Sequence, residues 1–388
     1  LGILVQAEEL HDVRAAVGLE EGTFVHTRKR VIPVTSLAVD LKDTARLREE
    51  VFLPSGKESI GELLYWELGL LNAEAKAEEG HLDVKGDLSL FALWRCEHGE
   101  RETEFYETLL PFQTQFEISG CREGLIDDVV FRLTGENVTV KADEDGEERL
   151  LEAEAVLEAE MKLYEEGEME LLADLYATDC YLKPVMQTEE YENLLLKNDS
   201  RMRISERLPL ADGMPGILQI CRGNAEIKPD VCTREEETLK LSGVLEVSLL
   251  YISDEDERPL QSYRREIPFT HRIEVRGLTP ESTYDIRCQV TEASFGMVRN
   301  GEAEVKAELA FCVLAMENRK EEMIVDTERE EFEENRIENL PSMVGYTVKQ
   351  GETLWDIAKR YCTAEEEIIR LSDHGGEVRE GELLLLAK

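Results

Sequence analysis

The sequence predicts a multidomain, mainly β protein, in which two homologous antiparallel β-domains are followed by a small α+β module. Three observations predict this fold class. One long segment recurs along the chain, its matched positions alternate between apolar and polar residues, and the C-terminal residues change to a strand, helix, helix, strand (βααβ) pattern. Each β-domain is interpreted as either a sandwich or an open barrel, because alternation alone does not separate these architectures.

Composition limits the classes of partner. The chain of 388 residues has 44 Lys and Arg against 85 Asp and Glu, a formal net charge of −41. Such a charge repels phosphate backbones and anionic lipid, so we expect no nucleic-acid partner. No stretch approaches the roughly 20 apolar residues that cross a bilayer, so we expect no membrane insertion. The 42% of hydrophobic residues still suffices for packed cores beneath an acidic surface.

Catalytic and metal-binding motifs are not apparent in the sequence. The eight cysteines form no Cys-x-x-Cys pair, which favours scattered buried thiols in a reducing compartment. The histidines form no His-Glu-x-x-His helix, and there is no Gly-x-Ser-x-Gly elbow. We therefore predict a non-enzymatic protein without cofactor or metal.

The first predicted element is a helical segment at the N-terminus. Residues 1–23 include Leu4, Leu10, Val13 and Val17 at irregular helical spacing, and the chain begins at Leu1 instead of Met. We interpret this segment as the end of a truncated helix. Its acidic residues give no export signal.

The internal repeat defines the two β-domains. Leu41-Lys42 and Leu53-Pro54 recur at one offset as Leu196-Lys197 and Leu208-Pro209. After a two-residue insertion, the alternating run from Leu82 through Gly86 to Trp94 recurs from Leu239 through Gly243 to Tyr251, and Pro111-Phe112 recurs as Pro268-Phe269. A period of two over a dozen residues is typical of strands with one face on a core.

Two connecting segments separate these domains from each other and from the C-terminal module. The segment between the repeats carries Met169, Leu171, Leu172, Leu175 and Tyr176, a spacing that predicts a linking helix. The segment after the second repeat is rich in Glu and Arg and is predicted to be an extended, solvated linker. The predicted organisation is 1–23 N-terminal segment, 24–165 first repeat, 166–178 linking helix, 179–317 second repeat, 318–342 linker and 343–388 C-terminal module.

The C-terminal module begins with Gly345-Tyr346-Thr347-Val348 and the run Gly351-Glu352-Thr353-Leu354-Trp355-Asp356-Ile357-Ala358. Thr353 followed by Asp356 predicts a capped first helix whose apolar face holds Leu354, Ile357, Ala358 and Tyr361. Thr363 and Glu366 predict the start of a second helix, and residues 383–386 predict the closing strand. Trp355 lies off the apolar face, so we predict that it is partly exposed and is a hot spot for either a glycan or a protein partner.

This module resembles the LysM family, in which a Tyr-x-Val-x-x-Gly-Asp-Thr-Leu start precedes Ile-Ala. The resemblance implies a shallow groove for N-acetylglucosamine glycans such as peptidoglycan, between the loop before the first helix and the loop after the second. Ser372 stands where the family usually has Asn, and the chain ends Leu386-Ala387-Lys388 instead of Ile-Pro. The implied binding residues are Gly351, Glu352, Thr353, Leu354, Trp355, Ser372, Asp373, His374 and Gly375.

The second repeat gives a further resemblance. Residues 244–252, the acidic hairpin through Glu257, and Ile267-Pro268-Phe269 resemble the SPOCS domain of clostridial spore coat proteins. Joined to a C-terminal LysM, such domains form a family that includes the partner of the spore morphogenetic ATPase. The resemblance implies a coat-assembly scaffold in the mother-cell cytoplasm, at the forespore surface, whose LysM binds the ATPase or another coat protein.

Two functions therefore remain open. The first is the coat-assembly scaffold. The second is a wall-attachment protein whose LysM binds peptidoglycan and whose β repeats are spacers; it would lie in the cell wall if an export signal preceded Leu1. A wall hydrolase would need a catalytic constellation that the sequence does not offer.

Overall fold

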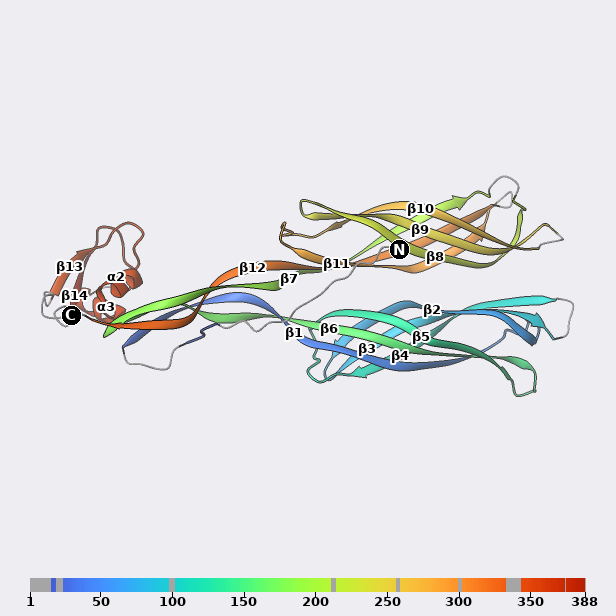
Figure 1. The fold of residues 1–388 in the computed structure, drawn as a ribbon, viewed down its shortest axis with the longest axis horizontal. Helices are drawn as coiled ribbons and strands as arrows, with labels where there is room; N and C mark the ends of the chain where they lie inside the picture. The colour runs from blue at the N-terminus through green and yellow to red at the C-terminus, as the bar shows by residue number, and fades with distance from the viewer. Residues whose placement is uncertain are drawn as a thin grey trace. The chain divides into compact units, whose positions relative to one another are not determined.

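The computed structural model describes residues 15–18, 24–97, 102–210, 214–255, 259–298, 302–332, 343–373 and 375–387. The chain divides into two compact units. One unit comprises residues 35–166 and 193–317 and holds most of both repeats. The other comprises residues 1–34, 167–192 and 318–388 and ends in the C-terminal module. Long strands contribute residues to both units, and Figure 1 shows the order of the elements along the chain.

The first repeat contains six antiparallel strands in two three-stranded sheets. The sheets have the orders β1-β6-β5 and β2-β3-β4. Apolar residues of both sheets form one buried core, in which Leu82, Val84 and Trp94 of β3 are fully buried. The first repeat is therefore a sandwich. Its strands are β1 (Val25–Phe52), β2 (Ile60–Glu78), β3 (His81–Cys96), β4 (Thr103–Glu117), β5 (Ile126–Ala142) and β6 (Glu148–Ala177).

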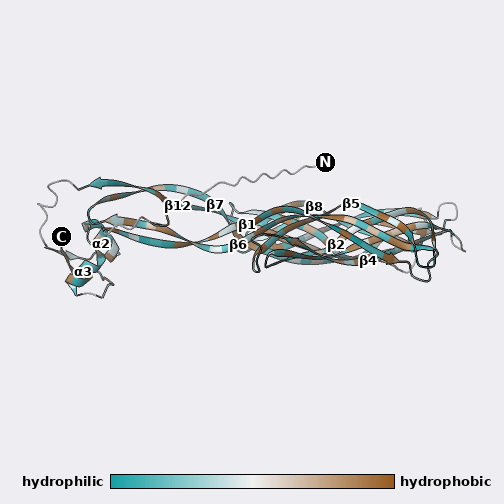
Figure 2. Cartoon of the chain, turned by 90° about the horizontal axis from the view of Figure 1, so that it is seen from below, coloured by the Kyte–Doolittle hydropathy of each residue, from teal (hydrophilic) through white to brown (hydrophobic). Residues whose placement is uncertain are grey.

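The second repeat has the same topology. Its sheets have the orders β11-β12-β7 and β10-β9-β8, with Leu239, Leu245 and Tyr251 of the central strand β9 buried. Figure 2 shows hydrophobic and hydrophilic residues intermixed along the strands. Burial along β9 alternates residue by residue, as the period of two predicts. The strands are β7 (Cys180–Leu208), β8 (Ile217–Glu235), β9 (Thr238–Ser253), β10 (Leu260–Glu274), β11 (Thr283–Met297) and β12 (Ala303–Glu331).

A pair of glycines shows how closely the repeats correspond. Gly86 of β3 pairs with Phe112 of β4, and Gly243 of β9 pairs with Phe269 of β10. A Cβ on Gly86 would lie 2.8 Å from the Phe112 ring, and one on Gly243 would lie 2.6 Å from the Lys228 carbonyl oxygen. Each glycine thus makes room for the aromatic ring on the neighbouring strand.

The predicted linking helix at 166–178 is wrong, because residues up to Ala177 continue strand β6. Leu171 packs with Ile32 and Met323, whereas Leu172 packs with Leu175 and Ile324 in a separate cluster. Since both faces of this strand segment are covered, its apolar residues do not alternate, and their spacing imitates a helix.

The predicted linker at 318–342 is wrong as far as Glu331, because β12 extends to that residue. Its charges form ion pairs with β7 and with the turn before it: Lys320 contacts Glu190 at 2.5 Å and Arg329 contacts Asp179 at 3.1 Å. Cross-strand ion pairs of this kind are compatible with an exposed strand. Residues 333–342 and most of the predicted N-terminal helix lie outside the described residues. Ala16, which is described, is not helical and exchanges backbone hydrogen bonds with Leu172 and Ile324.

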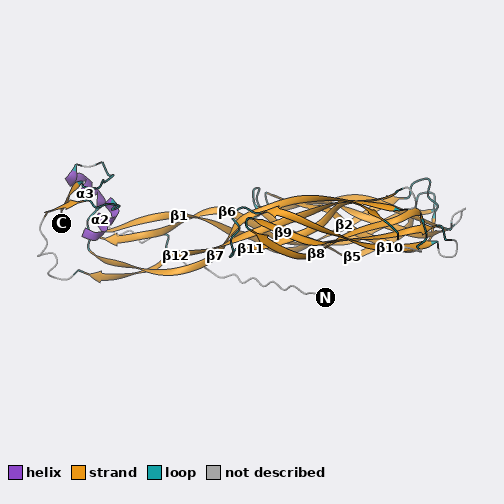
Figure 3. Cartoon of the chain, turned by 90° about the horizontal axis from the view of Figure 1, so that it is seen from above, coloured by secondary structure: helices purple, strands orange, loops and turns teal. Residues whose placement is uncertain are grey.

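The C-terminal module has the predicted strand, helix, helix, strand order. It consists of β13 (Met343–Thr347), α2 (Leu354–Tyr361), α3 (Glu365–Ser372) and β14 (Leu383–Ala387), with β13 and β14 antiparallel. In Figure 3 its two helices are drawn in purple and the strands of the chain in orange. Ile357, Ala358, Ile368 and Leu384 form its fully buried core. The remaining predicted domain bounds stay predictions.

Candidate functional site

The first helix of the C-terminal module begins as the sequence predicts. The Thr353 hydroxyl accepts a hydrogen bond from the Asp356 backbone N–H at 3.3 Å, and the Asp356 carboxylate accepts one from the Thr353 backbone N–H at 2.9 Å. This reciprocal capping box satisfies two N–H groups that a helix start leaves open. Gly351 precedes it with a φ of 79°, a left-handed conformation that favours glycine in the tight turn.

The second helix begins one residue later than a Thr363 cap would allow. Its N-cap is Ala364, which has no side-chain capping bond. Thr363 is instead 5% exposed, and its hydroxyl lies 3.5 Å from the Ala387 carbonyl oxygen of β14. Cys362, in the left-handed conformation, ends the first helix and turns Thr363 toward the closing strand. The predicted cap was therefore wrong because the hydroxyl joins the sheet instead.

Glu352, in the first loop of the predicted groove, accepts several hydrogen bonds from its own module. Its carboxylate accepts hydrogen bonds from the Tyr346 hydroxyl at 2.6 Å, the Lys349 backbone N–H at 3.0 Å and Arg360 at 2.8 Å. The Tyr346 bond, followed by the others, lowers the pKa of Glu352 to about 2. Glu352 therefore stays ionised and holds β13 to α2 instead of offering open acceptor positions.

The second groove loop offers less polar surface than its residue types suggest. The Ser372 hydroxyl accepts a hydrogen bond from the Leu385 backbone N–H at 2.8 Å, so it is engaged with β14. Asp373 and Gly375 are exposed, and no heavy atom lies within 4 Å of a Cβ placed on Gly375. His374 lies outside the described residues. Among the predicted positions that are described, Gly351, Thr353, Asp373 and Gly375 are exposed, and the Thr353 side chain is engaged in the capping box.

Trp355 is not the exposed residue that the sequence predicts. It is 7% exposed and packs edge-on against Tyr176 of β6, with 4.8 Å between ring centroids. Its indole Nε1 donates a hydrogen bond to Asp174 at 2.8 Å. Leu354 is also buried, at 7% exposure. The helix face away from the module's own core is thus covered by strand β6, which the local helical pattern could not reveal.

Asp174 is the polar centre of this contact, which we call the β6–α2 latch: Asp174, Tyr176, Trp355, Lys359 and Thr363. Lys359 donates to the second oxygen of the Asp174 carboxylate. Burial opposes ionisation of Asp174, but the hydrogen bonds from Lys359, Trp355 and the Leu175 backbone outweigh it, so its pKa is lowered. The latch is therefore strongest with Asp174 charged.

Tyr176 completes the latch from the same strand. Its hydroxyl donates to the Thr363 carbonyl at 3.0 Å, and its ring stacks on His26 of β1 with 4.9 Å between centroids. Burial raises the pKa of Tyr176 further above its usual range, so the hydroxyl keeps the proton that it donates. Sequence reasoning missed Asp174 and Tyr176, since nothing local marks a strand residue as the support of a distant helix.

The accessible part of the site suits binding more than chemical change. Among the described residues, no group of three or more His, Cys, Asp and Glu side chains is arranged to hold a metal ion. The only predicted groove side chain that remains both exposed and polar without an internal hydrogen bond in the described structure is Asp373. Across the part of the chain that is described, no helix is long and apolar enough to span a membrane.

Comparison with protein families agrees with this architecture. Residues 216–298, from the start of β8 to the end of β11, match the family described as SipL, SPOCS domain, and residues 346–375 match the LysM domain. No curated protein and no solved structure matches the chain significantly. The chain thus combines a SPOCS domain with a C-terminal LysM domain. Both are binding-domain types, and together they fit a sporulation-related coat protein.

Proposed function

We propose that this protein is a non-enzymatic scaffold of spore coat assembly, which acts in the mother-cell cytoplasm at the forespore surface. Its LysM groove binds a coat morphogenetic protein, for which the spore morphogenetic ATPase is the first candidate. The β repeats support the LysM module in the same chain and provide further binding surface. The combination of a SPOCS domain with a LysM domain supports the proposal.

The observation that carries the choice of a protein partner is the internal use of the groove's polar groups. Glu352, Thr353 and Ser372 all bond within the module, and Trp355 packs on Tyr176. A glycan is usually held by free hydrogen-bonding groups and an aromatic face. The described groove keeps little of either, whereas its open backbone and Asp373 are compatible with a protein surface.

Peptidoglycan binding is the second candidate. It is favoured by the LysM match and by three exposed glycine or aspartate positions. Gly351 lies in the loop before the first helix, and Asp373 and Gly375 lie in the loop after the second. Backbone groups at these three positions could contact an N-acetylglucosamine chain. The protein would then attach to the wall through this module.

One substitution tests both candidates in the full chain. Gly375→Trp places a bulky side chain in the groove, and Gly375 has open space and no positive φ that would strain it. Gly56→Trp, at an exposed turn of the first repeat with equally open surroundings, is the matched control. We expect the unaltered chain and the control to retain the purified ATPase in a pull-down, and Gly375→Trp to retain at least about ten-fold less.

The same three proteins are then co-sedimented with purified peptidoglycan. The scaffold proposal expects none to sediment above the background of a protein without LysM. Sedimentation that Gly375→Trp abolishes, without ATPase retention by any of the three, would replace the scaffold with the wall-attachment function. ATPase retention that is equal for all three would place the partner's contact outside the groove.

A further inference from the structure

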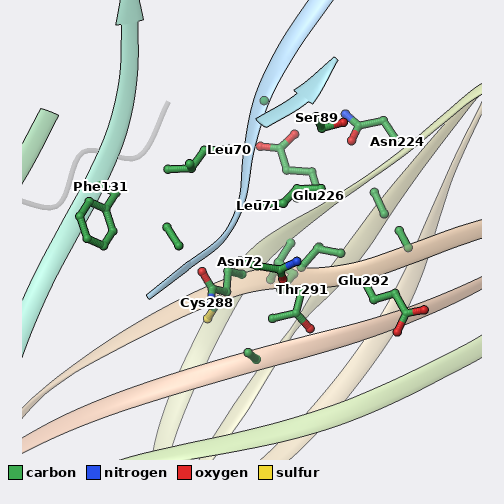
Figure 4. Close-up of a pocket in the computed structure, with 18 of the residues that line it drawn as sticks. Leu70, Leu71, Asn72, Ser89, Phe131, Asn224, Glu226, Cys288, Thr291 and Glu292 are labelled. Atoms are coloured by element: carbon green, nitrogen blue, oxygen red, sulfur yellow. The ribbon is translucent and has the colours of Figure 1, made fainter. Parts of the chain in front are cut away.

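A large cavity lies within the unit that holds both repeats. Its volume is about 1940 Å³, and most of its lining residues belong to β2 and β5 of the first repeat and to β8 and β11 of the second. Ion pairs join the repeats beside it: Arg222 contacts Glu67 at 3.5 Å, and Lys197 contacts Asp127 at 3.0 Å. Figure 4 shows side chains that line this cavity, including Ser89, Glu226 and Glu292.

Four of the strands that line the cavity are sheet edges. In the described sheets, β2 pairs with β3, β5 with β6, β8 with β9 and β11 with β12, each along one side only. An edge strand leaves every second backbone N–H and C=O without a ladder partner. An extended polypeptide can satisfy such groups by adding a strand.

The basic residues that line the cavity form ion pairs, whereas several of the lining carboxylates do not. All four basic residues that line it are already in ion pairs: Lys197, Arg201, Arg222 and Arg287. By contrast, the lining carboxylates of Glu74, Glu226 and Glu292 make no hydrogen bond or ion pair within the described part of the chain. The cavity therefore presents unbalanced negative charge.

Two of these glutamates face like charges across their ladders. Glu226 lies opposite Glu246, and Glu292 lies opposite Glu308. Glu246 and Glu308, which do not line the cavity, each have a cation nearby. Lys228 lies 2.7 Å from Glu246, and Arg203 lies 2.7 Å from Glu308. Like charges directly opposite destabilise a sheet. A cation supplied by a ligand would relieve this repulsion at both positions.

One buried polar group also opens on the cavity. Ser89 of β3 is 5% exposed, lines the cavity, and makes no side-chain hydrogen bond in the described structure. It pairs with Gly69 of β2, which has no side chain to cover it. The hydroxyl is not one of the fully enclosed polar atoms that lack a partner, so it is accessible from the cavity. A ligand's backbone carbonyl or amide would satisfy it.

We propose that this cavity binds an extended polypeptide segment that carries lysine or arginine side chains. Its backbone pairs with an edge strand, its basic side chains contact Glu226 and Glu292, and its apolar side chains contact Leu70, Phe131 and Ile227. This site is separate from the LysM groove and gives the β repeats a binding role of their own, so it does not rest on the function proposed for that groove.

A designed peptide of eight alternating Lys and Val residues tests the site in the full chain. Affinity is measured by calorimetry at low and physiological salt, against an alternating Glu and Val peptide. We expect Glu226→Gln with Glu292→Gln to weaken Lys-Val binding by about five-fold or more, since two ion pairs are lost. Gly69→Trp, whose Cβ meets only Ser89 at 4.0 Å, should weaken binding by obstructing the cavity beside β2 and Ser89.

The controls separate a specific site from general attraction to an acidic chain. Glu144→Gln with Glu206→Gln removes the same charge at exposed positions away from the cavity and should leave affinity within about two-fold. Hydrogen exchange should slow in residues 67–75 and 220–229 when the peptide binds. Equal losses in both double variants, or protection confined to other strands, would overturn the proposal, as would the absence of Lys-Val binding. Gly375→Trp should leave this binding unchanged, so failure here and failure of the LysM function are distinguishable.

Discussion

Single side chains decide how the LysM module meets the rest of its unit, and Asp174 is the most informative of them. It accepts from Trp355 at 2.8 Å and also from Lys359, which joins a strand to a helix far along the sequence. The contact converts Trp355 from a candidate binding residue into a support of the module. The predicted groove positions Gly351, Asp373 and Gly375 remain exposed, so the latch does not cover them.

We predict that the β6–α2 latch weakens in acid. The pKa of Asp174 is lowered from its ordinary value of 3.8, so charged Asp174 stabilises the latch above that value. This stabilisation is lost as the pH falls toward and through the lowered pKa. Fluorine NMR of the chain with 5-fluorotryptophan, assigned by Trp355→Phe, should show the Trp355 signal moving to an exposed environment below about pH 4.

Substitution at Asp174 tests the same contact at neutral pH. Asp174→Ala should move the Trp355 signal as acid does, whereas Asp174→Asn keeps an acceptor for the indole and should move it less. Asp373→Asn, which alters an exposed carboxylate without an internal partner, is the control and should not move it. An unchanged Trp355 signal in Asp174→Ala would contradict the role given to Asp174.

At the scale of elements, the two central strands β3 and β9 carry the strongest evidence of the repeat. Each has a glycine directly opposite a phenylalanine on the next strand. The glycines are nevertheless not equally constrained. At Gly86 the nearest atoms belong to the movable ring of Phe112, whereas at Gly243 the nearest atom is a backbone oxygen of Lys228.

We therefore predict that Gly243→Ala destabilises the protein more than Gly86→Ala. The Phe112 ring can rotate away from a new methyl group, but the β8 backbone at Lys228 cannot move without disturbing its ladder. Overpacking of this kind costs about 1–3 kcal/mol, and we expect Gly86→Ala near the lower end. Calorimetric unfolding measures the difference, with Gly296→Ala, which has open space, as the control. Equal losses at the two central glycines would show that the rings alone set the cost.

At the scale of the unit that holds both repeats, charge complementarity joins domains of a strongly acidic chain. Arg222 of β8 is largely buried, lies 5.5 Å from the Phe91 ring centroid, and pairs with Glu67 and Glu107 of the first repeat. Arg287 of β11 pairs with Asp128 and donates to the Val129 carbonyl at 2.6 Å. Basic residues of one repeat thus meet acidic residues of the other.

We predict that Arg222→Gln uncouples the repeats. Its loss removes two ion pairs and a cation–π contact, a cost of about 1–2 kcal/mol to the coupling. Unfolding followed by calorimetry should then broaden or separate into two transitions. Arg264→Gln is the control, because Arg264 is 72% exposed and reaches Glu246 only at 3.8 Å. A single unaltered transition in Arg222→Gln would show that the repeats are coupled through other contacts.

Local pattern by itself determined the two β repeats and the LysM module, whereas only the structure decided that each repeat is a sandwich and not an open barrel. Residues near one another in sequence set the strand alternation in β3 and β9 and the Thr353–Asp356 capping box. Direct repetition of the sequence makes Gly86 and Gly243 equivalent. These features follow from steric and hydrogen-bonding rules that act within a few residues, so they were predictable.

Tertiary structure alone decided the rest. The segment with Leu171, Leu172 and Leu175 became a strand because both of its faces are covered, and Trp355 became buried because β6 supplies Asp174 and Tyr176. The cavity and its unpaired carboxylates arise only where edges of both repeats meet. Each of these outcomes depends on contacts between residues far apart in the chain. Such contacts produce no periodic pattern in the sequence.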